Sequence, residues 1–252
     1  MARVVAVIPA RWASTRFPGK PLALLGGEPM ITHVIRRARS SRSVDEVLVA
    51  TDDDRIAQAA RRAGAEVVIT GECASGTDRV AEAVRGRSGI ALVVNLQGDE
   101  PLLSGANVDV LVAGMLERPE VSIGTLCRPL PAERSNDPNA VKVVRRVDGR
   151  ALYFSRSPVP HPREPRAAAQ LWRLHLGIYA FRPEALELFV SLGPSPLERA
   201  ESLEQLRALE HGLEILVLDA PEDAFGVDTP EDLGRVERML GRRPDAGDHG
   251  RG

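Results

Sequence analysis

A continuous apolar run at residues 4–8, VVAVI, constrains the fold more than any other feature of the sequence. A run rich in β-branched residues and free of polar ones is typical of a strand buried on both faces, as in parallel sheets covered by helices. Helical spacing over 29–39, a second apolar strand at 46–50, a capped helix to about residue 63 and a third strand at 66–69 follow with short links. This alternation predicts a doubly wound α/β fold, with a mostly parallel central sheet and helices on both faces.

The loop after the first predicted strand carries three cations, Arg11, Arg16 and Lys20, together with the hydroxyl of Ser14. Ligands of open α/β sheets bind where the carboxyl ends of strands meet their loops. Arginine and lysine there suit a polyanion, because they offer a planar fork of donors and a mobile point charge. The loop lacks the G-x-G-x-x-G and Walker patterns, which weakens simple dinucleotide and ATPase interpretations. An ordinary basic surface loop is the alternative, since charge alone is a weak signal.

Composition excludes several classes of function. The net charge of -2 leaves no global basic field for nucleic acid, and the aromatic share of 4% offers no platform for stacking bases. Cys73 and Cys127 are too few and too isolated for a disulfide framework or a zinc site, which favours free thiols in a reducing compartment. No apolar stretch is long enough to span a bilayer. We therefore expect a cytoplasmic protein without membrane insertion.

Two further loops connect predicted strands to helices and carry residues suited to ligand binding. Ser75, Gly76 and Thr77 precede a helix; Ser and Thr are good caps, and Gly lets a ligand approach the backbone closely. A capped loop without a ligand is the alternative. The apolar strand at 91–96 ends in QGDEP, which includes Asp99. The position of Asp99 fits either a Mg²⁺ ligand beside a phosphate or a turn aspartate that accepts hydrogen bonds from its own backbone.

Residues 127–182 interrupt the alternation of helices and strands. Two strand-like segments at 136–144 and 151–156 flank the dipeptide DG at 148–149, which is a strong hairpin signal. Residues 172–181 alternate well enough to form another strand. We therefore predict an antiparallel hairpin subregion inserted into a single domain of residues 1–240.

The caps of two helices are visible near the C-terminus. The string SPLE at 195–198 is a capping box with Pro at the first helical position, and this helix is expected to run to about Glu210. Thr229 caps a last helix in a similar way, and Asp228 there would favour the positive end of the helix. Residues 241–252 are polar and contain Gly and Pro, so we expect a disordered tail.

Together these motifs resemble the cytidylyltransferases that activate 3-deoxy-manno-octulosonate (Kdo). The loop at 8–22, which contains IPAR and PGKPL, is also similar to that of CMP-sialic acid synthetases and does not separate the two families. The strings NPNAVKVV and YFSR match the Kdo enzymes, as do QGDEP, HLGIY, PSPLE and GVDTP. The resemblance runs from residue 4 to about 240 and implies a Rossmann-like nucleotidyltransferase fold.

The resemblance implies transfer of CMP from CTP to Kdo, giving CMP-Kdo and pyrophosphate for lipopolysaccharide biosynthesis. It also implies Mg²⁺ as cofactor and a homodimer formed through the hairpin-containing insert. By the same resemblance, Asp99 and Asp228 are the expected metal ligands, and the expected catalytic residues are these two together with Arg11 and Lys20. The nucleotide-binding candidates are Arg11, Ser14, Arg16, Lys20, Ser75, Gly76, Thr77 and Arg79. The sugar-binding candidates are Gln97, Arg156, His175, Tyr179, Glu204 and Gln205.

Structural roles are the alternative for several of these residues. Arg156 would also suit a solvated strand end, and His175 and Tyr179 would also suit a satisfied core. Two other functions stay open: a cytidylyltransferase for another acid sugar, such as 8-amino-Kdo or sialic acid, and a non-catalytic protein that binds nucleotide sugars. The joint presence of Arg11, Lys20, Asp99 and Asp228 argues against the second, because a binder would not need both carboxylates.

Overall fold

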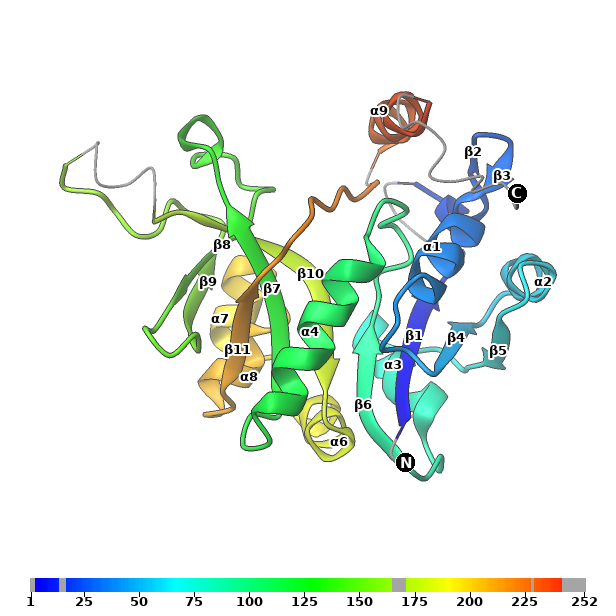
Figure 1. Cartoon of the computed structure of the whole chain (residues 1–252), viewed down its shortest axis with the longest axis horizontal. Helices are drawn as coiled ribbons and strands as arrows, with labels where there is room; N and C mark the ends of the chain where they lie inside the picture. The colour runs from blue at the N-terminus through cyan, green and yellow to red at the C-terminus, as the bar shows by residue number, and fades with distance from the viewer. Residues whose placement is uncertain (1–2, 14–16, 165–170, 228, 242–252) are drawn as a thin grey trace, which may run out of the picture.

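The first strand, β1 (Arg3–Ala10), lies inside the main sheet, and its apolar run is buried, as its sequence predicts. Val4, Ala6 and Ile8 face one hydrophobic cluster, whereas Val5 and Val7 face another. Side chains alternate across a strand, so these clusters lie on opposite faces of the sheet. The computed structural model describes residues 3–13, 17–164, 171–227 and 229–241, and Figure 1 shows the arrangement of their elements.

The other strands of the main sheet are β4 (Glu46–Thr51), β5 (Glu66–Ile69), β6 (Ile90–Asn95), β7 (Ile123–Pro129), β8 (Lys142–Arg145), β9 (Ala151–Ser155), β10 (Arg173–Phe181) and β11 (Ile215–Asp219). In the described part of the chain the order is β11-β7-β10-β6-β1-β4-β5, with β8 attached to β10 and β9 to β8. The pairs β1–β4, β1–β6, β4–β5 and β11–β7 are parallel. Strand β10 is antiparallel to both β6 and β7. The prediction of a mostly parallel sheet with an antiparallel insert is confirmed.

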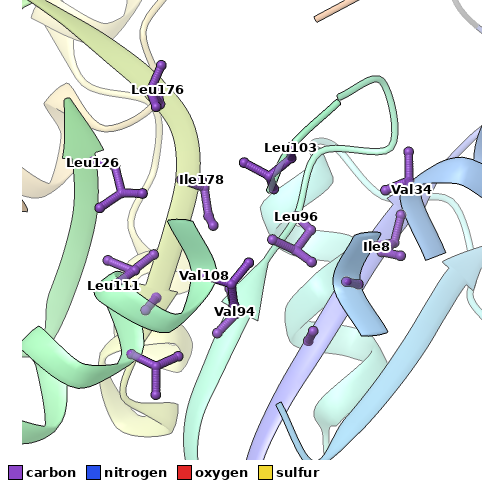
Figure 2. Packing of buried hydrophobic residues seen from close by; sticks show 14 of the residues in the cluster. Ile8, Val34, Val94, Leu96, Leu103, Val108, Leu111, Leu126, Leu176 and Ile178 are labelled. Atoms are coloured by element: carbon purple, nitrogen blue, oxygen red, sulfur yellow. The ribbon is translucent and has the colours of Figure 1, made fainter. Parts of the chain in front are cut away.

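Helices cover both faces of this sheet. The first cluster contains residues of α1 (Met30–Arg39), α2 (Asp54–Arg62) and α4 (Gly105–Glu117). The second contains residues of α3 (Gly76–Val84), α6 (Pro183–Ser191) and α8 (Leu206–Glu210). Figure 2 shows the first cluster, in which Val108 of α4 lies beside Val94 of β6. The two faces of one sheet therefore carry the two main cores.

A smaller cluster joins the segment after β1 to the segment after β11. It contains Leu25, Met30, Leu102, Val227 and Val236. Its elements include the two-stranded sheet of β2 (Leu24–Leu25) and β3 (Glu28–Pro29), and the last helix, α9 (Pro230–Leu240). Figure 1 shows α9 beside this small sheet, away from the main sheet. We call this group the satellite core, because it packs the segments after β1 and after β11 against each other.

One predicted helix is wrong in its extent. The capping box at Ser195 is present, but the helix it opens, α7 (Pro196–Glu201), stops after six residues, and α8 starts only at Leu206. Ser202 ends α7 with a φ of 51°, in the left-handed region that breaks a helix. The segment between the two helices is therefore a turn, and it carries Glu204 and Gln205.

The strand predicted at 136–144 is wrong in its start, because β8 begins only at Lys142 and the residues before it form turns. The remaining predictions about elements hold to within a few residues in the described ranges. The hairpin turn between β8 and β9 contains Gly149, whose φ of +89° only glycine adopts readily. Thr229 and Asp232 form a capping box at the start of α9. The tail predicted from 241 lies, after Gly241, outside the described residues. In the described ranges, none of the helices combines the length and the apolar character needed to cross a membrane.

Candidate active site

Three segments meet at the carboxyl end of β1, as expected of a ligand site in an open α/β sheet. Gly98, in the loop after β6, lies so close to β1 that a Cβ atom there would be 2.8 Å from the carbonyl oxygen of Pro9. Gly76, at the start of α3, lies against the ring of the same proline. The close approach at Gly98 admits no other residue without displacement of the backbone. It places Asp99, the next residue, at the end of β1.

Lys20 and Asp99 form the polar centre of this site. The Nζ atom of Lys20 donates to Asp99 Oδ2 at 2.6 Å and to the carbonyl oxygen of Val227 at 2.9 Å. The backbone N–H of Val227 in turn donates to the carbonyl oxygen of Asp99 at 2.8 Å. Residues from three distant parts of the sequence are thus held together, and the segment that leads to Asp228 runs past Asp99. Asp228 itself, like Ser14 and Arg16, lies outside the described residues.

The loop that carries Lys20 is fixed by a close contact with Trp12. Gly19 has a φ of +71°, and a Cβ atom there would lie 2.7 Å from the Trp12 ring. The guanidinium of Arg55, near the start of α2, lies 3.3 Å from the centre of the same ring. Arg11, next to Trp12, is exposed to solvent. The loop is therefore held against α2 while the side chain of Arg11 stays accessible to a ligand.

The N-terminus of α3 is joined to the α7–α8 turn by one carboxylate. Ser75 Oγ donates to Glu204 Oε1 and Thr77 Oγ1 donates to Glu204 Oε2, both at 2.7 Å. Ser75 also caps α3 by accepting from the N–H of Asp78, as predicted. Asn95, at the end of β6, donates to Thr77 Oγ1 at 3.5 Å. The structure thus brings the nucleotide candidates Ser75 and Thr77 into contact with the sugar candidate Glu204.

Arg79 has a different environment from the exposed candidates. It is 3% exposed, and its guanidinium donates to Asp52 Oδ2 at 2.6 Å, to the hydroxyl of Thr70 and to the carbonyl of Gly71. These bonds join the end of β4 to the segment after β5. They do not test its predicted contact with a nucleotide, which stays a prediction.

A cavity of about 210 Å³ opens between the sheet and the helices α6 and α8. Five of the six sugar-binding candidates line it: Gln97, His175, Tyr179, Glu204 and Gln205. Its apolar wall comes from β7, β10, β11, α6, the α7–α8 turn and α8: Ile123, Phe181, Ile215, Phe189, Leu203 and Ala208. The broken helix explains how Glu204 and Gln205 reach this cavity, because a continuous helix would have put them on an exposed face.

One residue in this cavity wall, and another next to it, carry buried polar atoms without hydrogen-bond partners in the described residues. Gln205 is 8% exposed, and its Nε2 atom has no partner there. The same holds for Oδ1 of Asn95, which is 1% exposed and bonds the cavity residue Thr77 through its amide nitrogen. Unsatisfied polar groups are costly when buried, so an amide donor in a cavity wall favours a polar ligand.

His175 and Tyr179 contribute two polar side chains to the cavity wall. His175 Nε2 lies 3.0 Å from Thr125 Oγ1, and its ring meets the Phe154 ring edge-on at 5.0 Å. Burial lowers the pKa of His175 to about 3, so the ring is neutral at physiological pH. Burial, and then the charge of Glu204, raise the pKa of Tyr179 well above its ordinary value, so its hydroxyl stays protonated. Neither ring is therefore charged, and both act as hydrogen-bonding or packing groups.

A β-bulge in β10 separates these two residues. Leu176 pairs with Leu126 and Tyr179 pairs with Thr125. Gly177 and the residue after it are therefore extra residues on β10, because Leu126 and Thr125 are consecutive on β7. A Cβ atom on Gly177 would lie 3.2 Å from Glu100 Oε1. The bulge thus lies where β10 meets the QGDEP loop in the cavity wall, and bulges are common beside ligand sites.

Arg156 is the sugar candidate that the structure does not bring to the cavity. Its guanidinium donates to three backbone carbonyls, those of Pro138, Glu201 and Ser202. These bonds hold the end of β9 against the α7–α8 turn. They leave the predicted role in binding a carboxylate untested.

Sequence reasoning missed Thr125 and Asn95, which position His175 and Thr77. Both sit within apolar strands and are at most 1% exposed. A lone Thr or Asn in such a strand carries no local signal, since only the pairing of strands shows which side chain it faces.

The strand-end loops, the paired Lys20 and Asp99, and the cavity lined by Gln97 form the candidate site. A family model described as cytidylyltransferase matches residues 5–215. A cytidylyltransferase from Leptospira borgpetersenii serovar Hardjo-bovis (strain JB197) shares the fold, with a TM-score of 0.65 at 19% identity over 97% of this chain and 89% of that one. The chain is thus a member of the cytidylyltransferase class.

Closer relatives specify the family. The 3-deoxy-manno-octulosonate cytidylyltransferase of Anaeromyxobacter dehalogenans (strain 2CP-1 / ATCC BAA-258) is 52% identical over 95% of this chain and 98% of its own length. That of Myxococcus xanthus (strain DK1622) is 51% identical over 96% and 98%. A solved structure of CMP:2-keto-3-deoxy-manno-octonic acid synthetase, complexed with CTP, has a TM-score of 0.90 and 41% identity over 95% of this chain and 99% of its own. The chain belongs to the 3-deoxy-manno-octulosonate cytidylyltransferase family.

Proposed function

We propose that this protein transfers CMP from CTP to Kdo and releases pyrophosphate. The observation that carries the proposal is the cavity that includes Gln97 of the QGDEP loop, whose wall contains five residues matched to the sugar-binding motifs of the family. Relatives that are about half identical over nearly the full chain bear the name of this activity. In this reaction the anomeric hydroxyl of the sugar attacks the α-phosphorus, and pyrophosphate leaves. Such transfers depend on positioning and on neutralisation of charge more than on covalent catalysis.

The basic loop would bind the triphosphate. Arg11 is exposed at the end of β1, and Lys20 lies beside Asp99, so both are near the place where strand-end ligands bind. Ser14 and Arg16 are expected to assist. Backbone N–H groups at the start of α3 add partial positive charge near Gly76 and Thr77. These groups would fix the α-phosphorus in line with the incoming hydroxyl.

The donors around Asp99 fit a magnesium ion. The carboxylate of Asp99 and the carbonyl of Val227 are hard oxygen ligands, and both already lie around a cationic group, Lys20 Nζ. The described residues contain no cluster of three or more His, Cys, Asp or Glu side chains suited to a metal. Magnesium is commonly held by one or two carboxylates together with substrate phosphates. We propose that Asp99 and Asp228 hold it, where it would neutralise phosphate charge and activate the attacking hydroxyl.

The cavity would orient the acid sugar. Gln205 offers an unsatisfied amide donor, and Glu204 offers acceptor oxygens close to Ser75 and Thr77. Gln97 lies on the loop that carries Asp99, so a sugar bound to it would be next to the phosphate site. The neutral ring of His175 and the protonated hydroxyl of Tyr179 complete the polar wall.

The test is pyrophosphate release from each of the four nucleoside triphosphates, with and without Kdo and Mg²⁺. We expect release only when CTP, Kdo and Mg²⁺ are present together. Release with CTP and sialic acid or 8-amino-Kdo, but not with Kdo, would overturn the proposed sugar. Absence of release from folded protein that still binds CTP would favour the non-catalytic alternative.

The metal ligands are tested by single substitutions. Asp99→Asn and Asp228→Asn are each expected to lower kcat by at least about 100-fold at saturating Mg²⁺, because loss of one electrostatic contact to the reacting phosphate costs on the order of 10²–10³-fold. Asp54→Asn, at an exposed position in the first turn of α2, is the matched control and should keep wild-type turnover. Near-normal kcat in either active-site variant would refute the assignment.

We also propose a homodimer that works in the cytoplasm. Strand β9 pairs with β8 alone among the described strands, and Leu152 on it is 59% exposed, which supports an interface through the insert. The cysteines Cys73 and Cys127 are free, in keeping with a reducing compartment. Sedimentation equilibrium of the wild type and Leu152→Asp tests the dimer, which the substitution should weaken.

A further inference from the structure

The ammonium group of Lys20 occupies the place that a divalent cation would need on Asp99. Its Nζ atom lies 2.6 Å from Asp99 Oδ2 and 2.9 Å from the carbonyl oxygen of Val227. The side chain of Lys20 is 13% exposed and that of Asp99 is 32% exposed, so the contact is partly shielded from water. A charge-assisted bond of this length is at the strong end of its class.

We propose that Lys20 competes with the divalent cation for Asp99, so that the nucleotide-free protein binds the metal weakly until a triphosphate draws Lys20 away. The inference rests on the proposed function, because it takes Asp99 as a metal ligand. It adds a second role for Lys20, which holds the metal site in a metal-free state before it contacts the nucleotide.

The competition follows from charge and from the number of acceptors. Lys20 carries one positive charge on a flexible stem, and it uses one carboxylate oxygen and one carbonyl of the donor set. A divalent cation that approaches Asp99 must displace this charge, and it must also shed water, which Mg²⁺ does reluctantly. Metal binding to the protein alone therefore loses the lysine contact and is opposed by a like charge nearby.

A bound triphosphate would draw Lys20 away from Asp99, because its phosphates carry more negative charge than one carboxylate. A triphosphate carries several negative charges, and Lys20 stands on a three-residue turn, Lys20–Leu22, at the carboxyl end of β1, where that ligand is expected. Movement of Nζ to the phosphates frees Asp99 Oδ2 at the moment when phosphate oxygens become available as further metal ligands. Binding of nucleotide and metal is then positively coupled, and the coupling is reciprocal.

The experiment measures Mn²⁺ binding to nucleotide-free protein by the EPR signal of the free ion. The variants are wild type, Lys20→Met, Lys20→Arg, Asp99→Asn and the double variant Lys20→Met/Asp99→Asn. Arg42→Met, which removes one positive charge from an exposed position, controls for the change in net charge. We expect Lys20→Met to bind Mn²⁺ at least 10-fold more tightly than wild type, Lys20→Arg and Arg42→Met. The double variant should lose this gain.

Two results would overturn the inference. One is equal Mn²⁺ affinity in wild type and Lys20→Met; the other is a gain in Lys20→Met that the double variant keeps, since the ion would then not be on Asp99. Turnover separates this failure from failure of the proposed function. If CMP transfer needs both Mg²⁺ and Asp99 while Lys20→Met binds Mn²⁺ like wild type, only the competition is wrong.

Discussion

At the scale of single residues, burial rather than charge decides what His175 can do. The ring contacts Thr125, Phe154 and Tyr179, and its pKa of about 3 means that the native protein does not bind a proton there near neutral pH. It therefore cannot serve as a general acid at physiological pH. Its neutral nitrogens can only donate or accept a hydrogen bond, which suits orientation of a sugar hydroxyl.

This burial makes a testable contribution to stability. An unfolded histidine titrates near 6.5, so between pH 6.5 and about 3 the unfolded chain binds a proton that the native state excludes. Stability is thus present above pH 6.5 and is lost as pH falls, by up to about 1.4 kcal/mol per pH unit for one group. Between pH 7.5 and 5.0, wild type should lose about 2 kcal/mol more than His175→Gln in urea unfolding.

The control for that comparison is His161→Gln, at an exposed position. Carboxylates titrate in the same way in all three proteins, so their effect cancels in the difference. An identical loss of stability in wild type and His175→Gln would contradict the assigned burial of the neutral ring.

At the scale of elements, an ion pair sets the turn that carries Glu204 and Gln205. Arg207 on α8 donates through Nε and Nη2 to both oxygens of Glu198 on α7, at 2.8 and 2.7 Å, and through Nη1 to the carbonyl of Leu192. The two side chains are 7% and 13% exposed. This ion pair joins α8 to α7, and the turn between them lines the cavity.

Removing one partner of the Arg207–Glu198 ion pair should lower the free energy of unfolding more than removing both charges. Arg207→Met leaves the carboxylate of Glu198 buried without its partner, and we expect the free energy of unfolding to fall by about 3 kcal/mol. The double variant Arg207→Met/Glu198→Gln leaves no unpaired charge and should recover at least half of that loss. Urea unfolding of the two single variants and the double variant measures the coupling. A double variant as unstable as the sum of the single changes would argue against a buried pair.

The same elements show where sequence reasoning succeeds and where it fails. The burial of β1 follows from an apolar run, and the caps at Ser75, Ser195 and Thr229 follow from residue type, because both are local effects. The break at Ser202 has no local signal, and the ion pair that joins α7 to α8 links residues nine positions apart. The cavity is also unpredictable in detail, because its wall combines strands that are neighbours only in the folded sheet.

Residue motifs located the candidate site better than they located individual contacts. Five sugar-binding candidates share one cavity, and Lys20 meets Asp99, although the two are far apart in sequence. The bonds of Arg79 to Asp52 and of Arg156 to backbone carbonyls had no local signal. Both arginines satisfy their donors on protein groups, and a sequence cannot show which acceptors a long side chain will reach.

At the scale of the whole molecule, the candidate site is built partly on the main sheet and partly on the smaller satellite core. The two main clusters cover the faces of the large sheet, whereas the satellite core under α9 is small. Asp99 stands on the loop after β6, but Val227, which shares Lys20 with it, belongs to the satellite core. Small clusters with few buried residues open at lower free energy than the main core. The part of the site proposed to hold the metal therefore depends on a small cluster, which we expect to open before the main sheet.

This dependence predicts separate effects on the two parts. Val236 is 1% exposed in the satellite core, so Val236→Asp would bury a charge and undock α9. In hydrogen-exchange mass spectrometry we expect amides of residues 230–240 to exchange at least about 10-fold faster, while amides of β1 and β6 keep their protection. Arg238→Asp, on the exposed side of the same helix, controls for the added carboxylate and should change neither.

The same variant should lose catalysis without global unfolding. Undocking of α9 releases the segment that carries Val227 and Asp228, so CMP transfer is expected to fall by at least about 100-fold, as for loss of a single phosphate-directed contact. The main sheet still holds Gln97, His175 and Tyr179, so the sugar cavity is retained. If amides of β1 lost protection in parallel with those of α9, the satellite core would be part of one cooperative unit, and metal site and main sheet would unfold together.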